Sequence, residues 1–554
     1  MKSKSVFLLL TALSILLGSM TLHAEAEGTS DLSTLYKTRD VDETWSFSDA
    51  QLIDLNTAQD GSEIRLTEKG DYVLSGTLNG QIVIEAQEDA KVRLILNGVS
   101  ITSLQGPAIY EKQADKLIVT LAEGTENTLT DGPVLTDADD TIGAALYTED
   151  DLSINGSGSL TVNGTRKHGI QSKADLIIAN GSIAVNAVLD GIRSRNSVLV
   201  LDGEISVIAG GDGIASTRTD ADGKGWIILA GGTVTIRTGD GAGAACVSAN
   251  SRDGGWGRRD DWGSASNTAD SGVSQKAVKA ATDLTVLDGT FSLNCADDGL
   301  HGVNVTVSGG IFTIQSGDDA MHADKTMTVN GGNIDITQCY EGLEGEDVSV
   351  CGGTIRIIAS DDGINASGGS DGSGFGGRGR SGGFTVSGSS GMLTIAGGEI
   401  AVTAGGDGLD SNGSILISGG VTGVWAATTT GEGAIDFNGT GSLSGGTLIV
   451  ASTGGVMRDT AGLSGQSIMA FSASGNAGET VTVLDEAGTV LGSFIPEQGF
   501  DTLMISSARL SEGSTCTVMS GTRALFSGSM TGSMAGAYGD DGFGKGRTRN
   551  RRGW

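Results

Sequence analysis

Hydrophobic and polar residues alternate in short runs through most of the chain, and the runs return at a fixed spacing. Four successive copies begin at residues 284, 305, 327 and 348, 21 or 22 residues apart, and the first reads "LTVLDGTFSLNCADDGLHGVN". Each copy holds two short alternating segments, separated by a Gly-Gly or Asp-Gly pair and followed by a second turn, commonly Asp-Gly. Period-two alternation predicts β-strands that turn one side inward. Further copies begin at 393 and 415, and earlier, looser ones at 152, 176, 198 and 226.

The repeat length selects the fold. No copy has helical periodicity, and a propeller blade would need about 40 residues per repeat. A short coil suits a parallel β-helix, in which each coil buries its inward side only by stacking on its neighbours. We therefore predict an all-β parallel β-helix with a small β-rich cap at its C-terminal end, because the last coil would otherwise expose unpaired strand edges.

Changes in the pattern mark the boundaries. Two Gly-rich stretches interrupt the coils and are predicted to be surface loops. Near residue 455 the strands become longer, and the chain ends in a Gly-rich basic stretch. The predicted organisation is a signal peptide at 1–26, a lead-in at 27–59, the β-helix at 60–455 with loop insertions at 250–272 and 367–391, a cap at 456–527 and a disordered basic tail at 528–554.

The N-terminus has the pattern of a secretory signal. Lys2 and Lys4 precede an apolar run at 6–17, and small residues at 24–26 suit a cleavage site. The run is shorter than a membrane span, so export is favoured over a retained anchor, and no later segment is long and apolar enough to cross a bilayer. We expect a secreted protein, extracellular or on the cell surface, that acts as a monomer.

Composition and charge exclude several classes of protein and disfavour several kinds of binding partner. The chain has 91 glycines but only 3 prolines, which excludes collagen, and its 38% hydrophobic residues exclude a flexible linker. Five scattered cysteines without a CxxC pair argue against a disulfide framework and a cysteine-based zinc site. The net charge of −32 disfavours nucleic acid and anionic membranes as partners, and favours divalent cations.

Aligning the copies puts acidic residues into one column at the second turn. Stacked coils lie about 4.8 Å apart, so these carboxylates would repel one another without a cation. Calcium suits them because it takes about six to eight oxygen ligands. Where a coil has one aspartate, as at Asp190 and Asp212, we favour a plain tight-turn role for Asp-Gly. The column is Asp190, Asp212, Lys276 from a degenerate coil, Asp298, Asp319, Glu341, Asp362, Asp407 and Glu432, with Asp297, Asp318 and Asp361 one position earlier. The predicted calcium ligands are Asp297, Asp298, Asp318, Asp319, Glu341, Asp361, Asp362 and Asp407.

Three positions later, a second column carries polar and varied side chains. It runs Arg193, Ala215, Lys279, His301, His322, Glu344, Asn365 and Asp410. We predict an exposed face that hydrogen-bonds a long polymer. The predicted substrate-binding residues are His301, His322, Glu344, Asn365 and Asp410. Zinc at the two neighbouring histidines is disfavoured, because no third soft ligand aligns with them.

Few aromatic side chains could stack on sugar rings. Trp256 and Trp262 lie in the first insertion beside charged residues, where they could grip a sugar. Trp226 and Trp425 fall at strand positions, where packing in the wall or core is favoured.

The motifs "DDGLHG", "GDDAMHAD", "YEGLEG" and "DDGINASGG", together with "GPAIYEK", "HGIQSKADL" and "GGDGLDSNGS", resemble a secreted bacterial family of carbohydrate-binding β-helices. The resemblance covers about residues 60–520. It implies a right-handed parallel β-helix that binds calcium and attaches to cellulose and to acidic plant polysaccharides such as polygalacturonate. The fold is also similar to that of calcium-dependent pectate lyases.

Several functions are compatible with this picture. A non-catalytic binder would use calcium to bridge its carboxylates to uronate carboxylates. A lyase would use calcium to acidify the proton beside the uronate carboxyl, with Lys276, Lys279 or Lys325 as the base. A two-carboxylate hydrolase ranks lower, because many stacked acids do not single out two. A structural adhesin would use the same fold without a sugar. We favour the non-catalytic polysaccharide binder with calcium as its cofactor.

Overall fold

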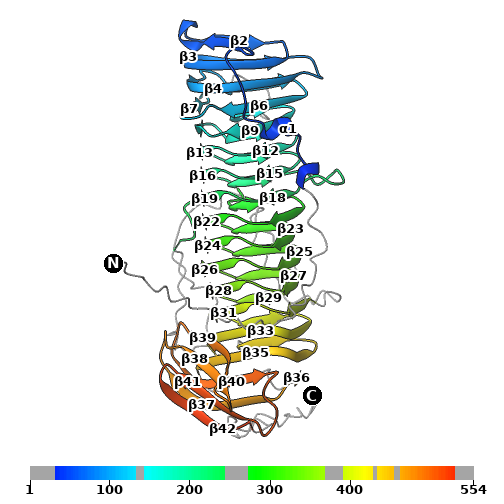
Figure 1. The fold of residues 1–554 in the computed structure, drawn as a ribbon, viewed down its shortest axis with the longest axis vertical. Helices are drawn as coiled ribbons and strands as arrows, with labels where there is room; N and C mark the ends of the chain where they lie inside the picture. Colours follow the sequence, from blue (N-terminus) through cyan, green and yellow to red (C-terminus); the bar gives the residue numbers. More distant parts are fainter. Residues whose placement is uncertain are drawn as a thin grey trace, which may run out of the picture.

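The computed structural model describes residues 32–132, 142–243, 273–367, 391–427, 433–453 and 462–530. These residues form a tall stack of short strands with a separate group of strands at the C-terminal end (Figure 1). Almost all pairing within the stack is parallel, and each strand pairs with its counterpart in the next coil. The predicted all-β parallel β-helix is therefore confirmed.

Each coil adds one strand to each of three walls, which we call A, B and C. Wall A contains β7 (Glu126–Thr130), β10 (Ser159–Gly164), β13 (Ser182–Ala187), β16 (Glu204–Ala209), β19 (Thr233–Thr238), β22 (Thr290–Cys295), β24 (Ile311–Ser316), β26 (Asn333–Cys339), β28 (Thr354–Ala359) and β31 (Glu399–Ala404). Wall B contains β2 (Ser62–Leu66), β5 (Ile109–Gln113), β8 (Ala144–Thr148), β11 (His168–Ser172), β14 (Ile192–Ser194), β17 (Ile214–Ser216), β20 (Val278–Lys279), β29 (Ile364–Ala366), β32 (Leu409–Ser411) and β34 (Ile435–Phe437).

Wall C and the longer strands complete the coils. Wall C contains β1 (Gln51–Asp54), β6 (Lys116–Leu121), β9 (Asp151–Gly156), β12 (Leu176–Ile178), β15 (Val198–Val200), β18 (Ile227–Leu229), β21 (Asp283–Val286), β30 (Met392–Ile395) and β36 (Leu463–Gly465). Strands that continue around a corner are β3 (Gly70–Glu85), β4 (Lys91–Thr102), β23 (Leu300–Val307), β25 (Met321–Val329), β27 (Leu343–Val350), β33 (Ser414–Ala427) and β35 (Gly441–Thr453).

The inward side chains form one continuous apolar core along the stack. Residues of the same kind lie above one another in register. Phe291 and Phe312 are Cα partners in adjacent coils, and their rings stack with centroids 4.7 Å apart. Since each coil leaves apolar surface that only its neighbours cover, the period-two pattern fixes which residues face inward.

The two turns of a coil need glycine for different reasons. At the corner from wall C to wall A, Gly289 and Gly310 have φ of +126° and +100°, which side chains other than glycine rarely adopt. At the corner from wall A to wall B, Gly191 has no such backbone. A Cβ atom there would lie 2.2 Å from Cγ1 of Val207. Asp-Gly does lie at the corner, as predicted, but glycine is required there for lack of space and not for a left-handed backbone.

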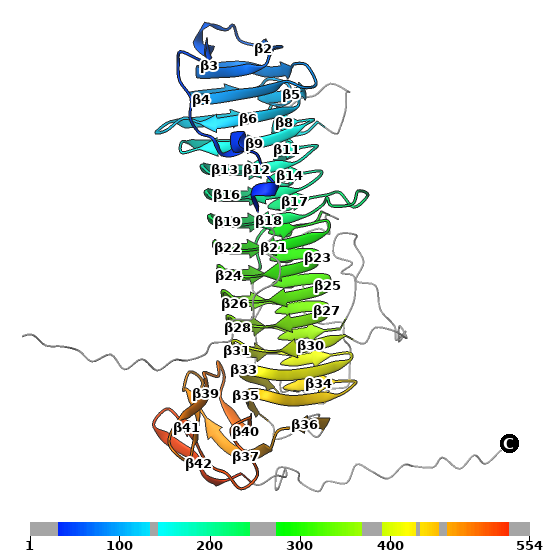
Figure 2. The ribbon, with the colours of Figure 1, turned by 45° about the vertical axis from the view of Figure 1, so that its right-hand side comes forward.

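The C-terminal end closes the stack with antiparallel strands (Figure 2). β40 (Phe500–Ser507) pairs antiparallel with β35 on one side and with β37 (Ile468–Gly475) on the other. A second sheet contains β39 (Val490–Phe494), β38 (Val481–Asp485), β41 (Thr515–Ser520) and β42 (Arg523–Ser529). Trp425 is buried in the core that these strands share with wall A, and its indole N–H donates to the Gly499 carbonyl (3.1 Å). Its predicted packing role is confirmed.

The lead-in crosses the outside of wall C before the coils begin. It contains two 3-10 helices, η1 (Leu32–Thr34) and η2 (Leu55–Thr57), and the helix α1 (Thr38–Val41). Asp40 of α1 is buried against the wall, where its carboxylate accepts hydrogen bonds from Lys116 (2.8 Å) and Ser153 (2.7 Å). Parallel pairing starts at β1, within the range predicted as lead-in.

Several predictions lie wholly or mostly outside the described residues. These are the signal peptide at 1–26, the insertions at 250–272 and 367–391, the basic tail at 528–554, and the side chains of Trp256, Trp262 and Glu432. Within the described ranges, no helix has the length and apolarity that a membrane crossing requires. Secretion and the monomeric state stay predictions.

Candidate functional site

The predicted acidic column lies at the corner between walls A and B. Each rung is tied to the next by a backbone hydrogen bond: the N–H of the residue after one rung donates to the carbonyl of the rung in the following coil. The rungs linked in this way are Asp190, Asp212, Lys276, Asp298, Asp319, Glu341, Asp362, Asp407 and Gly433. We call this series the acidic ladder. Its alignment was predicted correctly as far as Asp407, including Lys276 from the degenerate coil.

The last rung corrects the sequence alignment by one residue. The N–H of Gly408 donates to the carbonyl of Gly433, so Gly433 and not Glu432 continues the ladder. The same shift explains why Asp436 was missed. It lies three positions after the true rung and is the Cα partner of Asp410.

The second column is also in register, on the outward side of wall B. Parallel pairing joins Arg193, Ala215, Lys279, His301, His322, Glu344, Asn365, Asp410 and Asp436 in that order. The predicted exposure is wrong for three of them. His301, His322 and Asn365 are buried, with exposed fractions of 9%, 1% and 6%. Their polar groups turn toward the ladder carboxylates, as described below. Glu344 and Asp410 are partly exposed.

The ladder carboxylates have a structural use in addition to their charge. Asp298 accepts a hydrogen bond from the backbone N–H of Asp319 (3.2 Å), and Asp362 accepts one from the N–H of Asp407 (2.6 Å). Asp212 accepts the N–H of Lys276 (2.9 Å) in the same way. A carboxylate thus accepts a backbone N–H that has no backbone acceptor at the tight corner.

Basic side chains stand beside the first rungs. Arg193 donates to Asp190 across 2.5 Å. The Lys276 side chain is fully buried, with its Nζ 3.0 Å from Oδ1 of Asp297 and 2.5 Å from Oδ2 of Asp298. Burial alone would raise the pKa of Asp298, but the Lys276 ammonium and the neighbouring histidines hold it well below its usual range. A protein cation therefore neutralises this rung.

Two stacked histidines form the next part of the site. The rings of His301 and His322 lie parallel with centroids 5.0 Å apart. His301 Nδ1 lies 3.0 Å from Oδ2 of Asp298. His322 Nδ1 lies 3.0 Å from Oδ2 of Asp319 and 2.5 Å from Oε2 of Glu344. Burial lowers the pKa of His322, but the surrounding carboxylates outweigh it and raise the pKa overall.

The distances between the ligand atoms of Asp319, His322 and Glu344 show whether they could hold zinc. The ligand atoms of Asp319, His322 and Glu344 cluster closely enough to hold a metal ion. However, two ligands of one tetrahedral zinc at about 2.1 Å would be roughly 3.3 Å apart. The contacts of 2.5 and 3.0 Å are instead those of charge-assisted hydrogen bonds.

Beyond His322, every rung and every second-column residue in the described part of the chain is acidic or neutral. Burial, followed by the charge of Glu344, raises the pKa of Glu341 to about 9. Asn365 donates to Oε2 of Glu341 (2.8 Å), whereas its own Oδ1 is buried without a hydrogen-bond partner. In the adjacent coils, carboxylate oxygens of Asp407, Asp410 and Asp436 lie within 4.8 Å of one another. This end of the ladder is rich in oxygen ligands.

The three lysines considered as a catalytic base are placed differently. Lys276 is buried between two carboxylates. Lys279 donates to the Ser274 hydroxyl (3.0 Å), and Lys325 is exposed at an irregular point of β25. Neither Lys276 nor Lys279 presents an unengaged amine beside the ladder.

Comparison with known proteins adds the family. A family model described as a carbohydrate-binding domain-containing protein matches residues 60–320 and 319–485, which together exceed half of the chain. The protein belongs to this carbohydrate-binding domain family. The two matches run in tandem and cover the stack from the first coils into the cap.

Two relatives carry related descriptions. A carbohydrate-binding domain-containing protein of Acetivibrio thermocellus is 45% identical over 184 residues, which are 32% of this chain and 64% of the relative. The match thus spans less than two thirds of that relative. A solved structure described as the polysaccharide lyase-like protein from C. thermocellum, in a gadolinium derivative, is 26% identical. It covers 50% of this chain and 96% of its own, with a TM-score of 0.37.

Proposed function

We propose that this carbohydrate-binding domain protein is a non-catalytic binder of acidic polysaccharide, and that it holds the sugar through calcium at the C-terminal half of the acidic ladder. The observation that supports this most is the cluster of Asp407, Asp410 and Asp436, with Asn365 paired to Asp410 in the adjacent coil, on rungs that carry no basic residue. Polygalacturonate is the proposed ligand, with cellulose as a second one, and the protein would meet both outside the cell.

The residues at this place fit calcium. It prefers carboxylate and amide oxygens in a flexible arrangement, and three carboxylates already lie together here. The buried Oδ1 of Asn365 adds a neutral oxygen that no donor of the described residues satisfies. Bound there, calcium would supply positive charge to which a uronate carboxylate could attach.

The N-terminal half suits calcium less well, although Asp297, Asp298 and Asp318 also lie within metal-binding distance of one another. Asp298 uses Oδ1 for the N–H of Asp319 and Oδ2 for Lys276 and His301. A divalent ion beside the Lys276 ammonium would meet repulsion between like charges. We therefore place the calcium among the later rungs, and calcium binding by the predicted ligands Asp297, Asp298, Asp318 and Asp319 stays untested.

Calorimetry with polygalacturonate, in calcium and in EDTA, tests the proposal. Binding should occur in calcium and disappear in EDTA. The double variant Asp410→Asn with Asp436→Asn should abolish it, whereas Asp288→Asn, at the opposite corner of a coil, should bind like the unaltered chain. Binding that persists in EDTA, or that survives the double substitution, would contradict this function.

A further inference from the structure

One corner of the stack carries an enlarged loop on the side away from the acidic ladder. Between β17 and β18 the chain uses ten residues, 217–226, to pass from wall B to wall C. The same corner takes three residues between β14 and β15, and three between β20 and β21. The loop at 217–226 is thus seven residues longer than this corner requires to close a coil.

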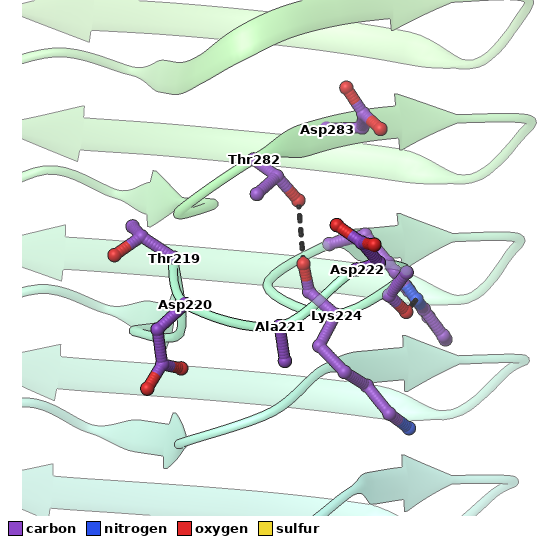
Figure 3. A pocket seen from close by; sticks show the side chains of 9 residues that line it. Thr219, Asp220, Ala221, Asp222, Lys224, Thr282 and Asp283 are labelled. Carbon is purple, nitrogen blue, oxygen red and sulfur yellow. Dashed lines mark hydrogen bonds between the residues drawn. The ribbon is translucent and has the colours of Figure 1, made fainter.

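The enlarged loop and the next coil border an open pocket of about 400 Å³. Figure 3 shows Thr282 and Asp283 of the next coil beside the loop, with the Thr282 hydroxyl bonded to the Lys224 carbonyl (3.1 Å). The half-buried indole of Trp226 also lines the pocket. Its lining is mostly polar with one aromatic side chain, a combination that suits a polar ligand with one apolar face.

The loop is held in place before any ligand arrives. The Trp226 indole N–H donates to the Gly223 carbonyl (3.1 Å), which fixes the ring. The Gly225 carbonyl accepts from the Ser216 hydroxyl (2.6 Å), and the Lys224 ammonium reaches Asp175 of an earlier coil (2.6 Å). Gly223 and Gly225 have φ of +71° and +87°, so the loop conformation depends on glycine at both positions. A fixed ring and fixed rim reduce the entropy lost on binding.

The charge around the pocket selects against acidic sugars. Three aspartates line it, Asp220, Asp222 and Asp283, and all three are exposed. Asp220 is paired with Arg218, so the uncompensated charge is that of Asp222 and Asp283. Its one lysine is turned to Asp175. An anion would meet repulsion here, whereas sugar hydroxyls can donate to carboxylate oxygens while the C–H face of the ring covers the indole.

We propose that this pocket binds a neutral pyranose of a polysaccharide, at a chain end or a side branch, with Trp226 as the stacking platform and Asp222 and Asp283 as hydroxyl acceptors. The site spans only two coils, which leaves room for roughly one or two sugar rings instead of a chain laid along the stack. This inference deepens the proposed function, since it rests on polysaccharide binding, but it requires neither calcium nor the ladder.

The test is titration of the full chain, in EDTA, with short cello-, xylo-, manno- and galacto-oligosaccharides, followed by tryptophan fluorescence and calorimetry. At least one neutral sugar should bind and change the fluorescence. Trp226→Ala should weaken that binding at least about tenfold, and Trp226→Phe should retain most of it. The double variant Asp222→Asn with Asp283→Asn should also weaken the binding of the neutral sugar, and it leaves the Trp226 indole in place.

Polygalacturonate binding in calcium is the matched control, and all these variants should keep it. Absence of any neutral-sugar binding, or equal affinity of Trp226→Ala and the unaltered chain, would overturn the assignment. If neutral sugars bind but polygalacturonate does not, the ladder proposal fails and the pocket stands. If polygalacturonate binds but no neutral sugar does, the pocket proposal fails and the ladder proposal stands.

Discussion

The two halves of the acidic ladder differ in the side chains that stand beside the carboxylates. From Asp190 to Asp319 the carboxylates stand beside Arg193, Lys276, Lys279 and the two stacked histidines. From Glu341 onward the corresponding positions hold acids, an asparagine and a glycine. The backbone corner is the same in both halves, and only the residues on it change.

This difference separates the roles of a stacked carboxylate. The corner needs an acceptor for a backbone N–H, and an aspartate carboxylate provides it in either half. Its charge must then be balanced, because stacked like charges in a partly buried site are costly. A basic side chain balances the charge permanently. An exchangeable cation in the C-terminal half would instead make the charge balance there depend on the cation concentration.

The largest effect should come from Lys276→Met, which removes the built-in cation. Asp298 would remain buried without its ammonium, and breaking such a pair costs about 3–5 kcal/mol of unfolding free energy. Chemical denaturation measures the loss. Adding Asp298→Asn should restore part of it, and the exposed Lys325→Met should change almost nothing. Unchanged stability in Lys276→Met would show that the two halves do not differ in this respect.

Glu111 is a buried carboxylate with which no basic side chain of the described residues pairs to balance a negative charge. It is fully buried on β5, and burial raises its pKa from 4.5 to about 7, although backbone hydrogen bonds from Asp150 and Glu149 lower the pKa in part. The folded chain thus keeps a proton that the unfolded chain releases, so stability should fall as the pH rises from about 4.5 to 7. Glu111→Gln should flatten this slope and be more stable above pH 7, by up to about 3 kcal/mol.

Melting curves across that pH range, with the exposed Glu126→Gln as control, measure the Glu111 effect. If Glu111→Gln and the unaltered chain keep parallel pH profiles, the carboxyl does not hold a proton in the fold.

The smallest effect should come from Arg193→Met at the start of the ladder. The Arg193 side chain is about one third exposed, so water and salt screen its pair with Asp190. We expect a loss of about 0.5–1 kcal/mol that shrinks as salt is added. A loss as large as that of Lys276→Met would mean that exposure does not set the strength of these pairs.

Much of this comparison could be read from the sequence, because a coil fixes its own register. Every copy repeats the same turns, so a residue three positions after a rung in one coil must pair with its equivalent in the next. That reasoning placed His301 against His322 and Lys276 among the acids. It lost one position at Glu432, where the coil that begins at 415 is longer than the regular coils of 21 or 22 residues.

The rest depends on where side chains point, which periodicity does not determine. The histidines were expected at the surface, yet they turn onto Asp298 and Asp319 and become buried. The amide of Asn365 gave no signal, since its unsatisfied oxygen arises only from the bond that its nitrogen makes to Glu341. The pocket at Trp226 was also missed, because its seven additional residues are few beside the two long insertions.

The antiparallel strand β40 has a consequence for growth of the stack. The exposed edge of a parallel coil can pair with another parallel coil, from this chain or from a second copy. The geometry of the coil itself sets no limit on the number of coils. β40 lies on the edge of β35 with the opposite polarity and offers the wrong hydrogen-bonding pattern for continuation. Without residues 468–530 the same edge would be open to head-to-tail addition, the kind of contact that does not close on itself and extends into fibres. The cap thus covers the core and also occupies the edge of β35 that a further parallel coil would need.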